Sequence, residues 1–327
     1  MKRRDVLSLL ALTGALVALP RADVTLESSL SDPTAEQTGT LGSPLWQVFA
    51  LATAKQAVYP LVHHQLGILA RELGDVRSEV DRKRLCALTG DLYQLAGEIF
   101  FDGNRYTDAA YCYSLAARAA PEAGDFDLWA CAMTRHAFVE LYEGRPAVAL
   151  RILSAASRIA QRGDSQLSTR YWVAAVQAEV YADLGDLSAC NRALDLADQV
   201  HVLSGQIHNG GWLRFDGSRL AEERGTCYLE LGRPDLAEDA LMVALEQELS
   251  PRRRGAVLAE LAILGAHRGD LDQVLHFSGA AMELAGRTGS GFLGRKLEGL
   301  QSRLAPLMAD GRVSDLHHRI SALSRAV

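Results

Sequence analysis

The stretch that decides the fold of this chain is Tyr228-Leu229-Glu230-Leu231-Gly232-Arg233-Pro234-Asp235-Leu236-Ala237. Its first residues favour a helix, and Gly232 can adopt the left-handed backbone conformation that ends one. Pro234 suits the first turn of a following helix, because its missing N–H would have no partner there. The stretch therefore predicts two consecutive helices joined by a short turn.

The same arrangement occurs at five places along the chain. The predicted turn residues are Asn104, Gly144, Gly185, Gly232 and Gly269, spaced by 40, 41, 47 and 37 residues. Twelve residues after each turn stands an alanine: Ala116, Ala156, Ala197, Ala244 and Ala281. Seven residues before each turn stands another small residue: Gly97, Ala137, Ala178, Gly225 and Ala262. Periods of this length are typical of stacked helical repeats, and the small residues let paired helices pack closely.

We therefore predict an all-α fold, a right-handed superhelical solenoid of helix pairs that covers residues 45–327. The segment from 45 to 73 is expected to form a first helix pair broken at Pro60, and two helices after Phe292 are expected to cap the array. A chain of 327 residues is too long for one compact core, but each unit of a repeat array buries its apolar face against its neighbours.

Residues 1–19 form an apolar segment that begins with Arg3 and Arg4. It has the composition of a twin-arginine export signal or of a linker helix, and its apolar run is too short to span a membrane. Residues 20–44 are rich in Ser, Thr, Asp, Pro and Gly and are predicted to be a flexible linker. A cytoplasmic protein is expected, with export as the alternative.

Charge and cysteine content narrow the classes of function. The net charge is −6 and the pI is near 5.9, so no overall basic field would attract nucleic acid. The five scattered cysteines include no Cys-x-x-Cys pair, which favours reduced core residues over disulfides or a zinc site. We identify no catalytic constellation, metal site or cofactor motif, and expect a non-enzymatic protein. The sequence leaves the oligomeric state open, with a homodimer as one alternative.

The repeating units resemble tetratricopeptide repeats. Leu95-Ala96-Gly97 with Phe100 is similar to the first-helix pattern of that family, and the stretch from Tyr228 to Ala237 is similar to its turn and second helix. The resemblance covers residues 85–284, with units longer than the ~34 residues usual for the family. The family's tryptophan and final proline positions are mostly absent.

A narrower resemblance is to the C-terminal sensor half of actinobacterial regulators that join a DNA-binding helix-turn-helix domain to tetratricopeptide repeats. The stretches from Trp212 to Gly225 and from Ser250 to Gly255 carry it, together with the Arg3-Arg4 segment. No helix-turn-helix pattern precedes the repeats in this sequence. The resemblance implies a protein- or peptide-binding module that acts as a sensor or scaffold in bacterial transcriptional regulation. The alternative is an exported or membrane-tethered repeat scaffold.

In this family, ligands bind in the concave groove that the first helices line. Carried over unit by unit, that position predicts a partner-binding set of Gln94, Glu98, Arg135, Trp172, Glu179, Arg219 and Glu222. These residues together make a mixed-charge surface with one aromatic. The alternative is that they are solvated faces with no partner.

Two further groups lie outside the regular pattern. Between Val200 and Asp216 the helical period is lost and glycine is frequent, which predicts an inserted loop. Its residues Trp212, Arg214, Phe215 and Asp216 are predicted to form a contact anchor for a partner or, alternatively, a plug over the core. Arg252, Arg253 and Arg254 follow Ser250-Pro251 at a predicted helix start and are candidates for anion binding, or for pairing with nearby glutamates.

Overall fold

The computed structural model describes residues 42–324, which fold into helices joined by turns and loops, with no strand among them. The predicted segment 1–19 and most of the predicted linker 20–44 lie outside the described residues. The first helix, α3 (Gly42–Leu51), begins inside the predicted linker. The all-α prediction is confirmed for the described part of the chain.

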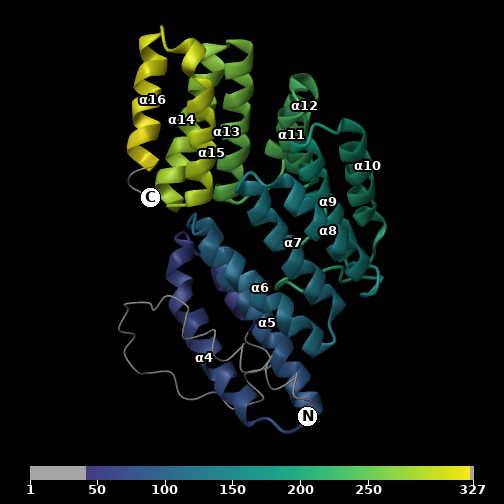
Figure 1. The fold of residues 1–327 in the computed structure, drawn as a ribbon. Helices are drawn as coiled ribbons and strands as arrows, with labels where there is room; N and C mark the ends of the chain where they lie inside the picture. The colour runs from purple at the N-terminus through teal and green to yellow at the C-terminus, as the bar shows by residue number, and fades with distance from the viewer. Residues whose placement is uncertain (1–41, 325–327) are drawn as a thin grey trace. The chain divides into compact units, whose positions relative to one another are not determined.

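The chain divides into two compact units. Among the described residues, unit 1 comprises 42–101, 105–177 and 199–216, and unit 2 comprises 102–104, 178–198 and 217–324. Unit 1 contains α3, α4 (Tyr59–Asp75), α5 (Glu79–Asp102), α6 (Tyr106–Ala123), α7 (Phe126–Tyr142), α8 (Pro146–Ala160) and the first part of α9 (Thr169–Asp183). Within it, α6 packs on α7 and α7 on α8; Figure 1 draws these helices in blue and teal.

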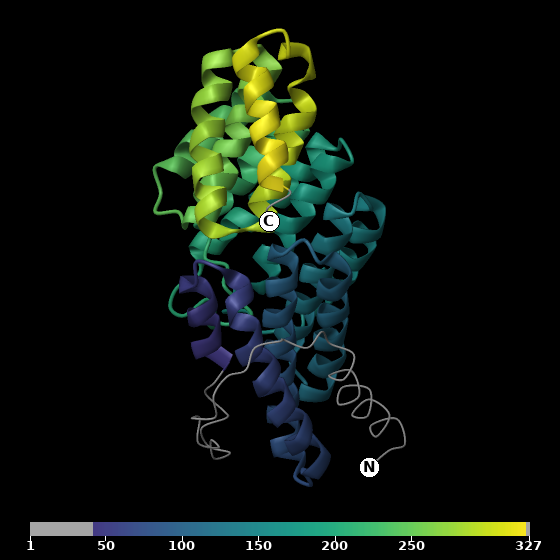
Figure 2. The same ribbon diagram turned by 90° about the vertical axis from the view of Figure 1, so that its left-hand side faces the viewer.

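Unit 2 contains the end of α9 and seven more helices: α10 (Leu187–Asp198), α11 (Leu220–Glu230), α12 (Pro234–Leu245), α13 (Pro251–Arg268), α14 (Leu271–Thr288), α15 (Gly291–Arg303) and α16 (Gly311–Ser324). The last four stand side by side in both views (Figures 1 and 2), and their leucines and alanines share one apolar core. Short 3-10 turns occur at Lys55–Val58, Gln199–Val202 and Ala305–Leu307. No helix among residues 42–324 is both long and apolar enough to cross a membrane.

The five predicted turns are confirmed, and all five have the same backbone conformation and hydrogen-bond pattern. Each turn residue has a positive φ, from 57° at Asn104 to 76° at Gly185. The N–H after the turn donates to the carbonyl five positions earlier, as from Arg233 to Tyr228 over 2.8 Å and from Arg145 to Glu140 over 2.9 Å. This bond satisfies a carbonyl that the helix end leaves open. Asn104 is the one non-glycine residue in the described part with a positive φ.

The small residues lie where the helices of a pair touch. All five predicted alanines that follow the turns are fully buried, and so are Ala137, Ala178 and Ala262 before them. At Gly97 and Gly225 an added Cβ would clash with Tyr113 and Leu241 of the paired helix. Close packing between the two helices of a pair therefore requires a small residue at these positions.

The predicted first helix pair differs from the structure. Helix α3 ends at Leu51, and α4 begins at Tyr59 with Pro60 in its first turn. A proline there costs no hydrogen bond, because the first N–H groups of a helix have no partner inside it. Pro60 therefore marks the start of a helix and not a break between two. The two predicted C-terminal helices correspond to α15 and α16.

Candidate functional site

The predicted site residues fall into two groups, one in each unit. The group in unit 1 contains Gln94, Glu98, Arg135, Trp172, Trp212 and Arg214. The group in unit 2 contains Glu179, Arg219, Glu222, Arg252, Arg253 and Arg254. The expected groove lined by one helix of every pair would take residues from both units, and the contacts within each unit are described here separately.

Arg135 of α7 is the centre of the cluster in unit 1. Its Nε donates to Oε1 of Gln94 over 3.1 Å, and its Nη1 lies 3.1 Å from Oε1 of Glu98. Gln94 and Glu98 are four residues apart on α5, so their side chains project from the same face of that helix. The Arg135 side chain is only 9% exposed. A buried guanidinium needs such partners, because burying an unpaired charge is costly.

Two indole rings flank the same guanidinium. The Cζ atom of Arg135 lies 4.8 Å from the ring centroid of Trp172 and 5.3 Å from that of Trp46. These distances are within the range of cation–π attraction. The stacked rings and the hydrogen bonds together hold Arg135 in one conformation.

Trp46 and Asp91 form a buried pair that the sequence analysis did not single out. The indole Nε1 of Trp46 donates to Oδ1 of Asp91 over 2.6 Å. Burial raises the pKa of Asp91 to about 7, and the hydrogen bond from Trp46 and the charge of Arg135 only partly offset this. Asp91 lies three residues before Gln94, so the shared face of α5 was a signal that could have identified it.

The inserted loop, residues 200–216, packs against this cluster. The main-chain carbonyl of Trp212 accepts a hydrogen bond from Nη2 of Arg135 over 2.9 Å, and the carbonyl of Ile207 accepts one from the N–H of Ser168 over 2.8 Å. A Cβ at Gly211 would lie 3.3 Å from Cδ1 of Trp46, so the loop backbone closely approaches the ring. Cluster and loop thus form one packed assembly within unit 1.

Of the four predicted loop residues, Phe215 is buried, Trp212 is partly exposed, and Arg214 and Asp216 are exposed. The apolar plug consists of Leu213 and Phe215, which are buried, while the Trp212 ring is partly exposed and contributes its carbonyl. The side chain of Asn209 holds the loop by accepting from the N–H groups of Gly211 and Leu213, each over 3.0 Å. Arg214 is exposed, with its guanidinium 5.8 Å from the ring centroid of Trp46.

The cluster in unit 2 is a network of glutamates and cations on α9, α11, α13 and α15. Glu222 pairs with Arg253 over 2.7 Å, and Glu260 pairs with Lys296 over 2.5 Å. The hydroxyl of Thr226 also donates to Glu260, over 2.9 Å. The three glutamates Glu222, Glu223 and Glu260 are buried, and Glu179 is partly exposed.

Burial raises the pKa of several of these carboxyl groups. The pKa of Glu179 is raised to about 8 by burial and by repulsion from Glu223, against the attraction of Lys296 and Arg219. The pKa of Glu223 is raised to about 7, mainly by burial, against the attraction of Arg219. The pKa of Glu260 is raised by burial in spite of Lys296.

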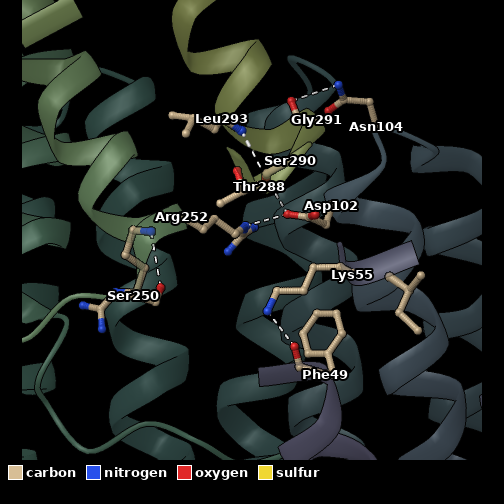
Figure 3. Close-up of polar contacts among 12 residues, drawn as sticks. Phe49, Lys55, Asp102, Asn104, Ser250, Arg252, Thr288, Ser290, Gly291 and Leu293 are labelled. Atoms are coloured by element: carbon tan, nitrogen blue, oxygen red, sulfur yellow. Dashed lines mark hydrogen bonds and ion pairs between the residues drawn. The ribbon is translucent and has the colours of Figure 1, made fainter. Parts of the chain in front are cut away.

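The three consecutive arginines do not converge on one point. Nε of Arg252 lies 2.6 Å from Oδ1 of Asp102, which also accepts from the hydroxyl of Ser290 over 2.7 Å (Figure 3). Arg253 pairs with Glu222, and Arg254 donates to the carbonyl of Leu245 over 3.4 Å. The three guanidiniums thus have three separate partners, and the structure does not bring them together as one anion site.

No three His, Cys, Asp or Glu side chains among residues 42–324 are arranged to hold a metal ion. All five cysteines are free and buried, and burial raises the pKa of Cys86 to about 11. Cys190 and Cys227 share a hydrogen bond, which lowers the pKa of Cys190 and raises that of Cys227.

The chain matches no known protein-family model and no curated protein sequence.

Proposed function

We propose that this chain is a non-catalytic protein- and peptide-binding module of stacked helix pairs that acts as a sensor or scaffold in bacterial transcriptional regulation. The observation that carries the proposal is the hydrogen bond from Arg135 to the carbonyl of Trp212, made between two indole rings. The regulatory context rests on the resemblance of the repeats to the sensor half of bacterial regulators.

The Arg135 cluster has the chemistry of a surface that binds polypeptide main chain. A main-chain carbonyl is present in every residue of a peptide, and Arg135 directs one N–H of its guanidinium to such an oxygen. Gln94 and Glu98 fix the rest of the guanidinium, so little side-chain entropy is lost when the carbonyl binds. Arginine and tryptophan are also the residues that most often dominate binding energy at interfaces.

The loop shows which kind of segment fits this surface. It places a carbonyl on Arg135, a glycine against Trp46 and the apolar side chains of Leu213 and Phe215 in the core. We propose that a partner peptide with a small residue followed by alternating apolar residues binds the same surface in place of the loop.

The proposal is tested with a synthetic peptide that has the sequence of the loop. In a variant whose residues 206–215 are replaced by an equally long Gly-Ser segment, the surface is left open. The synthetic peptide Ac-Gln206–Phe215-NH2 is expected to bind this variant with a Kd in the micromolar range, measured by isothermal titration calorimetry, and to bind the unaltered chain much more weakly. Circular dichroism establishes that the variant is folded.

Two substitutions distinguish binding at the Arg135 cluster from nonspecific binding. Arg135→Lys keeps the charge but loses the planar fork that contacts Gln94, Glu98 and the carbonyl together, so the peptide is expected to bind at least tenfold more weakly. Arg71→Lys alters an exposed arginine of the same unit and should leave binding unchanged. Peptide binding that Arg135→Lys leaves intact would refute the proposed surface. Random nonamer libraries then define the preferred partner sequence.

A further inference from the structure

The main chain of Trp212 is held by one basic and one acidic side chain. Its carbonyl accepts a hydrogen bond from Nη2 of Arg135 over 2.9 Å, and its N–H donates to the carboxyl group of Asp91. The preceding residue, Gly211, lies over the same carboxyl group, because a Cβ there would be 3.5 Å from Oδ1 of Asp91. The inserted loop, residues 200–216, therefore covers Asp91 as well as contacting Arg135.

Asp91 also connects the loop to helix α3. Its Oδ1 accepts a hydrogen bond from Nε1 of Trp46 over 2.6 Å, and a Cβ at Gly211 would be 3.3 Å from Cδ1 of the same indole. The Asp91 side chain is thus enclosed between α3, the loop and its own helix α5, and the residue is only 7% exposed. Displacement of the loop removes the cover over Oδ1 and lets water reach it.

We propose that Asp91 is a pH-sensitive switch for the inserted loop: a proton on Asp91 favours the closed loop, and loss of that proton favours opening. Burial disfavours the charged form of a carboxyl group, so the closed loop holds the proton more tightly than an open loop with Asp91 in water. Opening of the loop near neutral pH therefore releases a proton from the carboxyl oxygen to the solvent.

The charged groups around Asp91 come from α5, α7 and the loop. Arg135 of α7 favours the carboxylate form, but it also pairs with Glu98 of α5 over 3.1 Å. Helix α3 contributes the Trp46 indole and has no charged residue of its own. The loop contributes two exposed charges and two histidines, which are Arg214, Asp216, His201 and His208. Histidine commonly changes charge between pH 5 and pH 8, so the two histidines require a control.

The direction of the pH effect follows from the pKa in the two states. Burial raises the pKa of Asp91 to about 7 in the closed state, against the hydrogen bond from Trp46 and the charge of Arg135. In the open state the carboxyl group is in water, where the pKa of aspartate is ~4. The closed state has the higher pKa, so it is favoured at low pH and this advantage is lost as pH rises through 7. The equilibrium constant for opening should rise about tenfold between pH 6 and pH 8 and then level off.

This inference rests on the proposed function, because it describes how the peptide-binding surface of unit 1 becomes accessible. As pH rises, the loop covers the Arg135 cluster in a smaller fraction of molecules. The opening of the loop is measured without any peptide, and the peptide titration of the Gly-Ser variant is measured without the loop. Failure of one therefore leaves the other result standing.

The experiment measures hydrogen exchange of the full chain by mass spectrometry at pH 6, 7, 8 and 9, with each rate corrected for the intrinsic effect of pH on amide exchange. The protection of residues 207–215 is expected to fall about tenfold from pH 6 to pH 8 and to stay constant from pH 8 to pH 9. Helices α13 and α14 should change less than about twofold over the same range. Loop protection that does not depend on pH would overturn the proposal.

Matched variants assign the effect to one carboxyl group. Asp91→Asn keeps an oxygen that can accept from Trp46 and from the Trp212 N–H, but it cannot ionise, so its loop protection should be the same at pH 6 and pH 8. Asp75→Asn, at the exposed end of α4, and a chain with both loop histidines replaced by glutamine should keep the tenfold change. A pH dependence that persists in Asp91→Asn, or that disappears with the histidines, would contradict the assignment.

A second measurement leaves Asp91 unaltered and so does not depend on whether Asp91→Asn folds. The Tm of the unaltered chain is compared with that of the Gly-Ser variant, in which residues 206–215 no longer cover Asp91. The difference between the two Tm values should shrink by about 2–4 °C from pH 6 to pH 8, because only the unaltered chain encloses the carboxyl group. A difference that stays constant or grows with pH would also overturn the proposal.

Discussion

Arg135 donates a hydrogen bond to the main-chain carbonyl of Trp212, a residue 77 positions later in the chain, over 2.9 Å. The bond joins a helix of the repeating pattern to the loop that interrupts it. Because the guanidinium is also fixed by Gln94 and Glu98, the loop is held by a preorganised donor. A change at Arg135 is therefore expected to change how firmly the loop is held.

Weakening this donor should loosen the loop. In Arg135→Lys, residues 203–216 are expected to exchange their amide hydrogens at least fivefold faster than in the unaltered chain, while α13 and α14 are unaffected. Hydrogen exchange followed by mass spectrometry measures both regions in one experiment. Unchanged protection of the loop would show that Leu213 and Phe215 alone hold it in place.

Loss of the indole N–H of Trp46 should lower the unfolding free energy more than a change of the Trp172 ring that lies over Arg135. Trp46→Phe removes the donor to Asp91 and leaves a buried acceptor without its partner, a loss of about 1–3 kcal/mol of unfolding free energy. Trp172→Phe keeps an aromatic ring over the guanidinium and should cost less, about 1 kcal/mol or below. Urea unfolding of the two variants ranks the two effects, and equal losses would argue against the importance of the Asp91 hydrogen bond.

The raised pKa of Glu179 predicts how stability changes with pH. Its folded pKa of about 8 lies above the ordinary value, so its contribution to stability is complete below pH ~4 and is lost as pH rises through 8. Glu179→Gln removes this titration, and the variant should gain roughly 1–3 kcal/mol over the unaltered chain between pH 5 and pH 8.5. Urea unfolding at the two pH values measures the gain. Glu283→Gln should show no such dependence, and a flat difference for Glu179→Gln would contradict the raised pKa.

Gly225 lies at the contact between two paired helices and Gly286 does not. Replacing each of them by alanine should therefore change the unfolding free energy in opposite directions. Gly225→Ala places a Cβ against Leu241 and should lower the unfolding free energy by about 1–3 kcal/mol. Gly286→Ala adds a Cβ in α14 where nothing lies within 4 Å, and should raise it by about 0.5–1 kcal/mol. Thermal denaturation distinguishes the two directions. A Gly225→Ala protein as stable as the original would show that Leu241 can move aside.

The sequence correctly predicted the features that depend on residues close together in the chain. The positive φ at Gly232 and the buried positions of Ala244 and Ala197 follow from turn geometry and from spacing within one helix pair. It did not work at Pro60, because a proline that starts a helix and one that breaks a helix have the same local sequence signal. The solenoid and its family remain predictions.

The candidate sites could be predicted only as a set of residues. Gln94, Glu98 and Arg135 do meet, as their shared first-helix position suggested. The sequence analysis missed Trp46 and Asp91, whose side chains are 45 positions apart in the chain, and it did not predict the hydrogen bond from Arg135 to the main-chain carbonyl of Trp212. For Arg252, Arg253 and Arg254 it left two alternatives, anion binding or pairing with nearby glutamates, and in the structure each has an acceptor within the chain, Glu222 for Arg253.

By itself, the sequence determined that the described chain is built of helix pairs with tight turns, because backbone conformation and the size of a side chain at a fixed spacing act over a few residues. Only the tertiary structure decided that a loop carbonyl joins Gln94 and Glu98 on the guanidinium of Arg135 in unit 1. It also decided that Glu222 pairs with Arg253 and Glu260 with Lys296 in unit 2. Those outcomes depend on contacts between buried charged and hydrogen-bonding groups that are about 30 to 80 residues apart in the chain. The free energy of each contact includes the cost of removing these groups from water, which the local spacing of residues does not determine.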